Sequence, residues 1–112
     1  LWTTGYAHAT WPHAADAHAA ETLAAMRAWA AERDAWIAGS HVERRASDGA
    51  LVNRLRVVGP AGEAAWYDKA HLFPPMAEPE HLGAGDRRVG VEIAGARAAL
   101  SICFDLRFPE QY

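Results

Sequence analysis

The sequence predicts an α/β domain in which helices cover a mixed β-sheet on one face. An alanine-rich stretch with helical periodicity comes first, and several short apolar or alternating stretches follow, as expected for a helix and then strands. A proline after the last apolar stretch is placed to begin a further helix. With 112 residues the chain is the size of one small domain, and its hydrophobic content of 51% is sufficient for a packed core.

The composition excludes several classes of protein. A net charge of −3 does not suit a nucleic-acid partner, because a polyanion attracts a basic surface. The single cysteine cannot form an internal disulfide and is compatible with a reducing compartment, so we expect a cytoplasmic protein. No apolar run approaches the roughly 18 residues of a membrane helix, and no signal-peptide pattern is present, so no membrane partner is expected.

The clearest single element is a helix over residues 16–32, preceded by an aromatic, irregular loop over residues 1–12. Alanine dominates the helical stretch, and Asp16 is expected to be its N-cap. Four apolar residues fall on one face at the 3.6-residue period: Ala19, Leu23, Met26 and Ala30. We expect this face to cover the sheet.

Strands are predicted over residues 35–42, 51–58 and 64–68. Residues 59–62 read Gly-Pro-Ala-Gly, which joins the second and third strands as a hairpin. The charged stretch at residues 43–49 is interpreted as a turn, and its basic pair, Arg44 and Arg45, as part of a solvated loop.

A long loop rich in proline and glycine follows the hairpin at residues 71–88, and loops of this length tend to be functional. Further strands are predicted over residues 89–93 and 97–103, with a turn at residues 94–95 between them. The last of these strands leads straight into the only cysteine.

Cys103 is predicted to lie at a bend between a strand and a helix. Residues 100–102 read as a short buried strand, and Pro109 suits the first turn of a helix. Such a bend holds a sulfur at the end of a rigid strand, with backbone N–H groups of the next turn available to an oxyanion. The alternative is that Cys103 is a small buried hydrophobic residue, the commoner fate of a lone cysteine.

Two motifs together resemble the nitrilase superfamily of carbon–nitrogen hydrolases. The first, Tyr-Asp-Lys-Ala-His-Leu-Phe at residues 67–73, places Lys69 at the end of a predicted strand. The second, Ser-Ile-Cys-Phe-Asp-Leu-Arg-Phe-Pro-Glu, spans residues 101–110. Residues 1–6 and the acidic loop at residues 78–86 also resemble segments of this family, in the same order. Within the superfamily the chain looks most like the omega-amidase branch.

The resemblance implies part of a four-layer α-β-β-α sandwich with mixed β-sheet, in which two sheets pack together. It further implies that residues 1–112 are a partial carbon–nitrogen hydrolase domain, truncated at both ends and covering about its first half. Members of the family usually form homodimers or larger homo-oligomers, so we expect a homo-oligomer here.

Amide hydrolysis requires a nucleophile, an oxyanion donor and groups that move protons. Cys103 is the candidate nucleophile. Lys69 offers N–H donors and a positive charge to the anionic intermediate and the thiolate, and the backbone N–H of Phe104 is the natural second donor. The resemblance implies that Glu78 is a second glutamate near the lysine, while the family's acid–base glutamate stands immediately before the residue matching Leu1.

Each site residue has a simpler alternative. Lys69 could be a surface lysine at the end of a hairpin, and Glu78 an exposed loop carboxylate. His71 is a second choice as the base of a Cys–His pair, although its place in the motif looks structural. Asp105 and Arg107 are expected to fix the bend through hydrogen bonds.

These residues predict a thiol amidohydrolase that cleaves a small linear amide through a cysteine acyl-enzyme and releases ammonia. No metal site is implied, because the six histidines have no carboxylate or cysteine at ligand spacing. No organic cofactor is implied either. The side chain of Asn53 either lines the site or satisfies backbone groups. The alternative function is that of a catalytically inactive fragment or degenerate homologue acting as a structural or interaction module.

Overall fold

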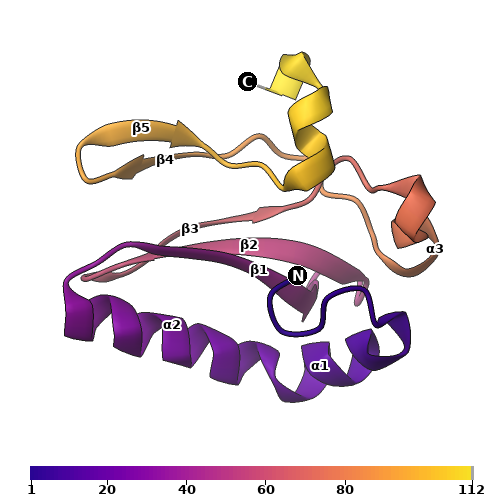
Figure 1. Cartoon of the computed structure of the whole chain (residues 1–112), viewed down its shortest axis with the longest axis horizontal. Helices are drawn as coiled ribbons and strands as arrows, with labels where there is room; N and C mark the ends of the chain where they lie inside the picture. The colour runs from indigo at the N-terminus through magenta and orange to yellow at the C-terminus, as the bar shows by residue number, and fades with distance from the viewer. Residues whose placement is uncertain (112) are drawn as a thin grey trace.

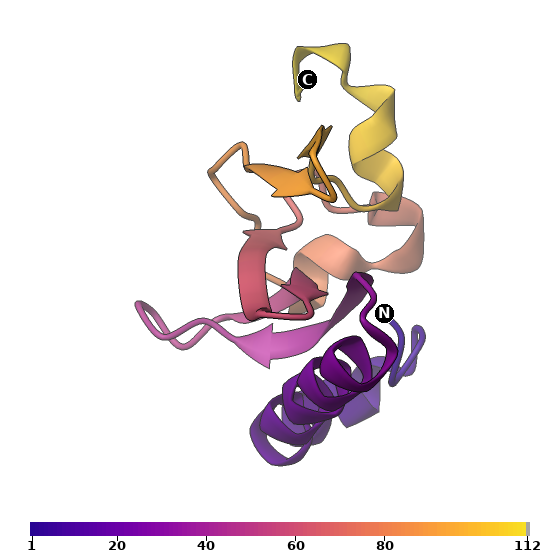
Figure 2. The same ribbon diagram turned by 90° about the vertical axis from the view of Figure 1, so that its left-hand side faces the viewer.

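The computed structural model describes residues 1–111 and stacks them in layers. Two helices lie under a three-stranded sheet, and a β-hairpin and the C-terminal helical turns lie on its other side (Figure 1, Figure 2). The helices are α1 (Trp11–Ala17), α2 (Ala19–Arg33) and α3 (Glu78–His81). The strands are β1 (Ile37–Arg44), β2 (Leu51–Gly59), β3 (Gly62–Asp68), β4 (Gly90–Ile93) and β5 (Ala96–Ala99). Short 3-10 helices are η1 (His8–Thr10), η2 (Pro74–Met76), η3 (Cys103–Arg107) and η4 (Pro109–Gln111).

None of the helices in the described part of the chain has the length and apolar character of a membrane span.

The first sheet has the order β1-β2-β3, and both of its strand pairs are antiparallel. Its strands confirm the three predicted over residues 35–42, 51–58 and 64–68, and the last two form the predicted hairpin. β4 and β5 form a separate antiparallel hairpin. Every strand pair among residues 1–111 is therefore antiparallel, so the mixed sheet and the four-layer stack remain predictions.

The predicted long helix is wrong at its start. A separate helix, α1, already begins at Trp11, so the loop predicted over residues 1–12 is shorter than expected. His18 lies between α1 and α2, and Asp16 lies within α1 rather than at an N-cap. The Asp16 carboxylate instead accepts two hydrogen bonds from Arg44, at 2.7 and 2.9 Å. The alanine-rich pattern runs through both helices and contains no signal for the break between them.

Apolar residues cover both faces of the first sheet. The predicted stripe of α2 packs on one face, where Met26 is fully buried in a cluster with Val58 of β2. On the other face, Tyr67 of β3 packs in a cluster with Ile102. Fully burying a large apolar side chain such as that of Met26 contributes about 1.5–3 kcal/mol to the stability of the fold. This second cluster holds the chain just before Cys103 against the strand that leads to Lys69.

Charged side chains form a buried network across the sheet, beside the turn predicted at residues 43–49. Glu43 is buried and accepts hydrogen bonds from Arg56 at 2.7 and 2.6 Å and from Arg54 at 3.3 Å. Arg54 also donates two hydrogen bonds to Asp68, at 2.6 and 2.8 Å. Burial tends to raise the pKa of Glu43, but hydrogen bonds and charges from His41 and Arg56 lower it to about 2. The predicted turn is thus wrong at Glu43 and Arg44, which belong to β1, while the side chain of Arg44 is exposed as expected.

Candidate active site

Lys69 is held at the end of β3 by main-chain contacts on both sides. Its N–H donates to the Asn53 carbonyl at 3.0 Å, and its carbonyl accepts from the Gly85 N–H at 2.9 Å. A Cβ at Gly85 would lie 2.2 Å from the Asp68 carbonyl oxygen, so only glycine fits there. Lys69 itself is 1% exposed, which excludes the surface lysine considered from the sequence.

Glu78 is the partner of Lys69. Lys69 Nζ donates to Glu78 Oε2 at 2.6 Å, and both side chains are fully buried. The same oxygen accepts the Phe73 N–H at 2.7 Å, while Oε1 has no hydrogen-bond partner within residues 1–111. The exposed-carboxylate alternative is therefore wrong. The ring centroids of Phe73 and Phe104 lie 5.0 Å apart, and this contact packs the Glu78 loop against the turn of Cys103.

Cys103 is the first residue of η3 and follows Ile102 in extended conformation. Its φ is +52°, a conformation that is uncommon for residues other than glycine and that clusters at functional sites. The thiol is free and exposed, so Cys103 is not the small buried hydrophobic residue of the alternative prediction.

The predicted bend is present, although the strand that enters it is shorter than expected. β5 ends at Ala99, after which the Leu100 N–H still donates to the Val89 carbonyl at 2.9 Å. Phe104 lies in the first turn of η3, where main-chain N–H groups lack a partner inside the helix. Pro109 opens η4, as predicted for a first helical turn, and position 112 lies outside the described residues.

Residues of the two motifs contact each other. The His71 N–H donates to the Asp105 carboxylate at 2.8 Å. Tyr6 of the N-terminal segment is also affected by this region, because burial, Glu78 and Cys103 together raise the pKa of Tyr6. Tyr6 has no signal in the sequence beyond its place in the family-like stretch at residues 1–6.

Asp105 and Arg107 were both expected to fix the bend through hydrogen bonds, and this is confirmed for Asp105 only. Asp105 is fully buried, and its carboxylate accepts hydrogen bonds from the Ile102 N–H at 2.9 Å and the Tyr67 hydroxyl at 2.8 Å. Arg107 is exposed and makes no ion pair within residues 1–111.

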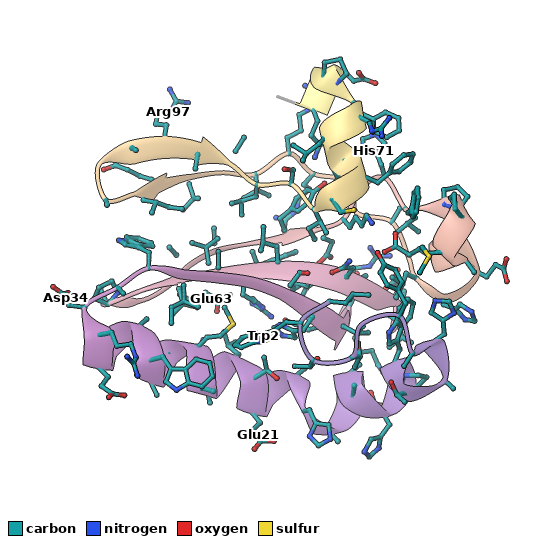
Figure 3. The ribbon with its side chains drawn as sticks, in the orientation of Figure 1. Trp2, Glu21, Asp34, Glu63, His71 and Arg97 are labelled. Atoms are coloured by element: carbon teal, nitrogen blue, oxygen red, sulfur yellow. The ribbon has the colours of Figure 1, made fainter. Side chains whose placement is uncertain are left out.

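His71 lies beside the helical turn that begins at Cys103 (Figure 3). Its Nδ1 is 2.9 Å from an Asp105 oxygen, and its ring stacks on Phe108 with centroids 3.7 Å apart. The His71 ring is thus held by Asp105 and Phe108, and neither of these contacts involves the Cys103 thiol. Asn53 is also buried, and its backbone carbonyl satisfies Lys69, whereas its side-chain oxygen has no partner in the described residues.

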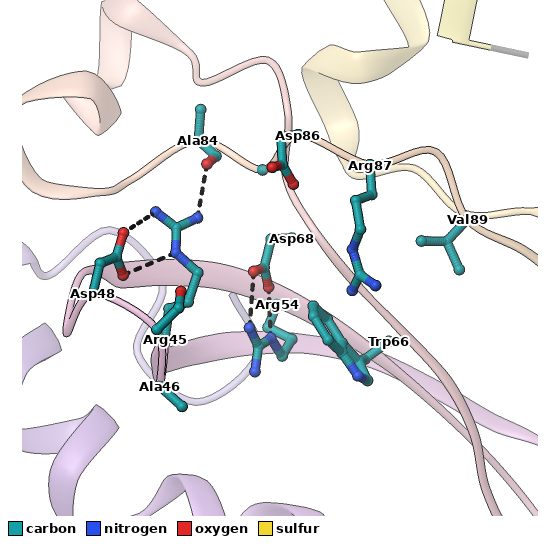
Figure 4. A pocket seen from close by; sticks show the side chains of 12 residues that line it. Arg45, Ala46, Asp48, Arg54, Trp66, Asp68, Ala84, Asp86, Arg87 and Val89 are labelled. Atoms are coloured by element: carbon teal, nitrogen blue, oxygen red, sulfur yellow. Dashed lines mark hydrogen bonds and ion pairs between the residues drawn. The ribbon is translucent and has the colours of Figure 1, made fainter.

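A cavity of about 500 Å³ lies apart from the cysteine turn (Figure 4). Arg54 and Asp68 face each other within it, and the guanidinium groups of Arg54 and Arg87 lie 4.1 and 4.0 Å from the ring centroid of Trp66. Asp68 is the last residue of β3 and directly precedes Lys69, so its bonds to Arg54 help to hold the strand end in place. Within residues 1–111, no group of three or more histidine, cysteine or carboxylate side chains is arranged to hold a metal ion.

Comparison with known proteins gives one family. The carbon–nitrogen hydrolase family matches residues 1–112. The chain is 41% identical to omega-amidase YafV of Yersinia enterocolitica, over 97% of this chain and 41% of that protein. It is 35% identical to 2-oxoglutaramate amidase of Bacillus subtilis, over 98% of this chain and 42% of that protein.

A solved structure agrees with these relatives. XC1258 from Xanthomonas campestris is described as a CN-hydrolase superfamily protein with an arsenic adduct in its active site. It superposes with a TM-score of 0.74 at 39% identity, over 80% of this chain and 33% of that one. The chain therefore spans less than half the length of each protein it resembles. A family match along its whole length, with an α/β structure that superposes on a member, shows that this chain belongs to the carbon–nitrogen hydrolase family.

Proposed function

We propose that the native protein is a thiol amidohydrolase that cleaves the terminal amide of a small linear dicarboxylic or keto acid and releases ammonia. The observation that carries the proposal is the fully buried Lys69–Glu78 pair, together with an exposed cysteine on a turn of positive φ. Two charges taken out of water gain little net stability from pairing. Their presence in this small core therefore favours a chemical role for the pair.

The proposed reaction begins when the Cys103 thiolate attacks the carbonyl carbon of the amide and the C=O electrons move to the oxygen. Lys69 Nζ and the Phe104 N–H donate hydrogen bonds to that oxyanion. The intermediate then collapses, and the amine takes up a proton and leaves as ammonia. Water attacks the resulting thioester, which releases the carboxylic acid and returns the thiol.

Carboxylates move the protons in this scheme. The family's acid–base glutamate, at the position before Leu1, takes the thiol proton and delivers it to the leaving amine. Packing supports this placement, since Leu1 lies against the same core cluster as Leu72, three residues after Lys69. Glu78 orients Lys69 through Oε2, and its unpaired Oε1 is available to assist proton movement. The route requires neither a metal ion nor an organic cofactor.

The relatives guide the choice of substrate. One is an omega-amidase and another is named for 2-oxoglutaramate, so we propose a substrate of this class. The family resemblance further supports a cytoplasmic homodimer. It also supports a four-layer α-β-β-α sandwich with mixed sheet, to which residues 1–112 contribute a part.

The proposal predicts the effect of removing the thiol. In the native protein, Cys103→Ala should abolish ammonia release from 2-oxoglutaramate and glutamine, because no acyl-enzyme can form. Ser101→Ala, two residues away, is the matched control and should retain turnover. Near-normal hydrolysis by Cys103→Ala would refute the mechanism. A folded native protein that hydrolyses neither amide would favour the interaction-module alternative.

A further inference from the structure

The Asp105 carboxylate collects four hydrogen bonds from three separate segments. Oδ1 is 2.8 Å from the His71 N–H and 2.9 Å from His71 Nδ1. Oδ2 accepts the Tyr67 hydroxyl at 2.8 Å and the Ile102 N–H at 2.9 Å. A carboxylate accepts at both oxygens, so it matches four converging donors, and its contact with Nδ1 assigns the Nδ1–H tautomer to His71.

Two of these segments flank Lys69. Tyr67 precedes the lysine in β3, and its hydroxyl also accepts the Ala70 N–H at 3.0 Å. Burial raises the pKa of Tyr67, and its hydrogen bond to Asp105 raises the pKa further, so the hydroxyl keeps its proton and acts as a donor. Through Tyr67 and His71, Asp105 therefore fixes the chain on both sides of Lys69.

The third segment is the turn of Cys103. The Ile102 N–H donates to Asp105 Oδ2, and the Asp105 N–H donates back to the Ile102 carbonyl at 3.2 Å. These reciprocal bonds enclose Cys103, which lies between them at φ +52°. A non-glycine residue keeps such a conformation only where its surroundings impose it.

We propose that Asp105 is a positioning residue that sets the Cys103 turn and the Lys69 strand end in one fixed relation. This inference rests on the proposed function, in which the Cys103 sulfur and the Lys69 amine act on the same carbonyl group. Asp105 takes no part in bond making. Its role is to keep both groups in register, and a misplacement of about 1 Å can reduce a rate by about 10²-fold.

The test compares three variants of the native protein in the amidase assay. Asp105→Asn keeps the size of the side chain but leaves one acceptor oxygen for four donors. We expect kcat to fall about 10²-fold, with KM changed by less than about threefold, because substrate contacts are untouched. Tyr67→Phe removes one donor to Asp105, together with the acceptor of the Ala70 N–H and the Gln111 side chain, and should lower kcat about tenfold. Glu110→Gln removes an exposed carboxylate near the same turn and should leave both constants unchanged.

A second measurement reports the geometry without turnover. NMR of ¹⁵N-labelled protein should give an Nδ1–H tautomer for His71 and a backbone signal of Cys103 outside the random-coil range. In Asp105→Asn, the His71 ring or the Ile102 amide must lose its acceptor, so at least one signal should shift, together with Cys103. Glu110→Gln should shift none of them.

The outcomes separate the two proposals. If the native protein releases no ammonia, the proposed function fails, and the NMR signals still decide whether Asp105 fixes the turn. If Asp105→Asn folds with parental kcat and unshifted signals, the positioning role is overturned while the amidase stands. If Asp105→Asn does not fold, Tyr67→Phe decides, and its parental kcat would overturn the role.

Discussion

Lys69 and Glu78 form an ion pair whose two side chains have no solvent exposure, with Nζ and Oε2 2.6 Å apart. Neither group was recognisable as buried from the sequence, because a lysine after a hairpin and a glutamate in a proline-rich loop are usually solvated. Removing one partner leaves the other charge buried without compensation, whereas replacing both with apolar groups can be nearly neutral. Stability and chemistry can therefore be separated at this pair.

We predict that Lys69→Met destabilises the protein by about 3–5 kcal/mol, because the Glu78 carboxylate loses its counter-charge. The double variant Lys69→Met with Glu78→Leu should recover most of this loss. Amidase activity should stay at least about 10²-fold down in both variants, because an oxyanion donor is missing. Urea unfolding and ammonia release measure the two effects. Recovery of activity along with stability in the double variant would show that Lys69 serves the fold alone.

At the scale of elements, the three strands of the first sheet are joined by charges as well as by the backbone ladder. Glu43 in β1 binds Arg54 and Arg56 in β2, and Arg54 binds Asp68 in β3. The folded state holds the pKa of Glu43 at about 2, below its ordinary value of 4.5. Between these two pH values the unfolded chain binds more protons than the folded chain.

We therefore predict that the stability contributed by Glu43 is complete above about pH 4.5 and is lost as the pH falls towards 2. Unfolding free energies measured by urea across this window should fall with acid. Glu43→Gln should lower stability at pH 7 and flatten the fall, whereas Glu32→Gln, at an exposed carboxylate that makes no ion pair within residues 1–111, should change neither. An unchanged slope in Glu43→Gln would assign the acid sensitivity to other groups.

Elements with strong local patterns were predictable, and those set by distant contacts were not. The alternation of β2, the turn at residues 59–62 and the stripe of α2 all follow from periodicity and turn residues. The break between α1 and α2 does not, because the alanine-rich pattern runs through it, and the burial of Glu43 does not, because it depends on the register of β1 against β2. The cysteine bend was predictable from its motif, while the positive φ of Cys103 required the structure.

At the scale of the whole molecule, the stack leaves large apolar side chains in solvent. Within residues 1–111, the exposed ones include Trp2, Tyr6, Trp29, Trp36, Met76 and Leu106. Such surfaces promote association when several lie on one molecule. The chain also spans only 41% of the length of its Yersinia relative, so the activity proposed here belongs to the native protein.

We predict that residues 1–112 expressed alone release no ammonia from 2-oxoglutaramate or glutamine. The proposed mechanism assigns acid–base catalysis to a glutamate at the position before Leu1, which residues 1–112 do not include, and an ordinary thiol, with a pKa of about 8.5, is only slightly ionised at neutral pH. We also expect the isolated chain to self-associate, which light scattering would detect. The native protein assayed in parallel is the control. Comparable turnover from both would show that this glutamate is dispensable and would make His71 the first candidate base.

The contact between Gly85 and Asp68 limits how this sequence can vary over evolutionary time. Gly49 has a positive φ of +74° but open space around it, a conformation that asparagine also adopts. Position 85 has no such freedom, because any side chain would meet the carbonyl of the residue preceding Lys69. Only glycine can therefore persist at position 85, so any descendant sequence that keeps Lys69 in this place must also keep a residue without a side chain there.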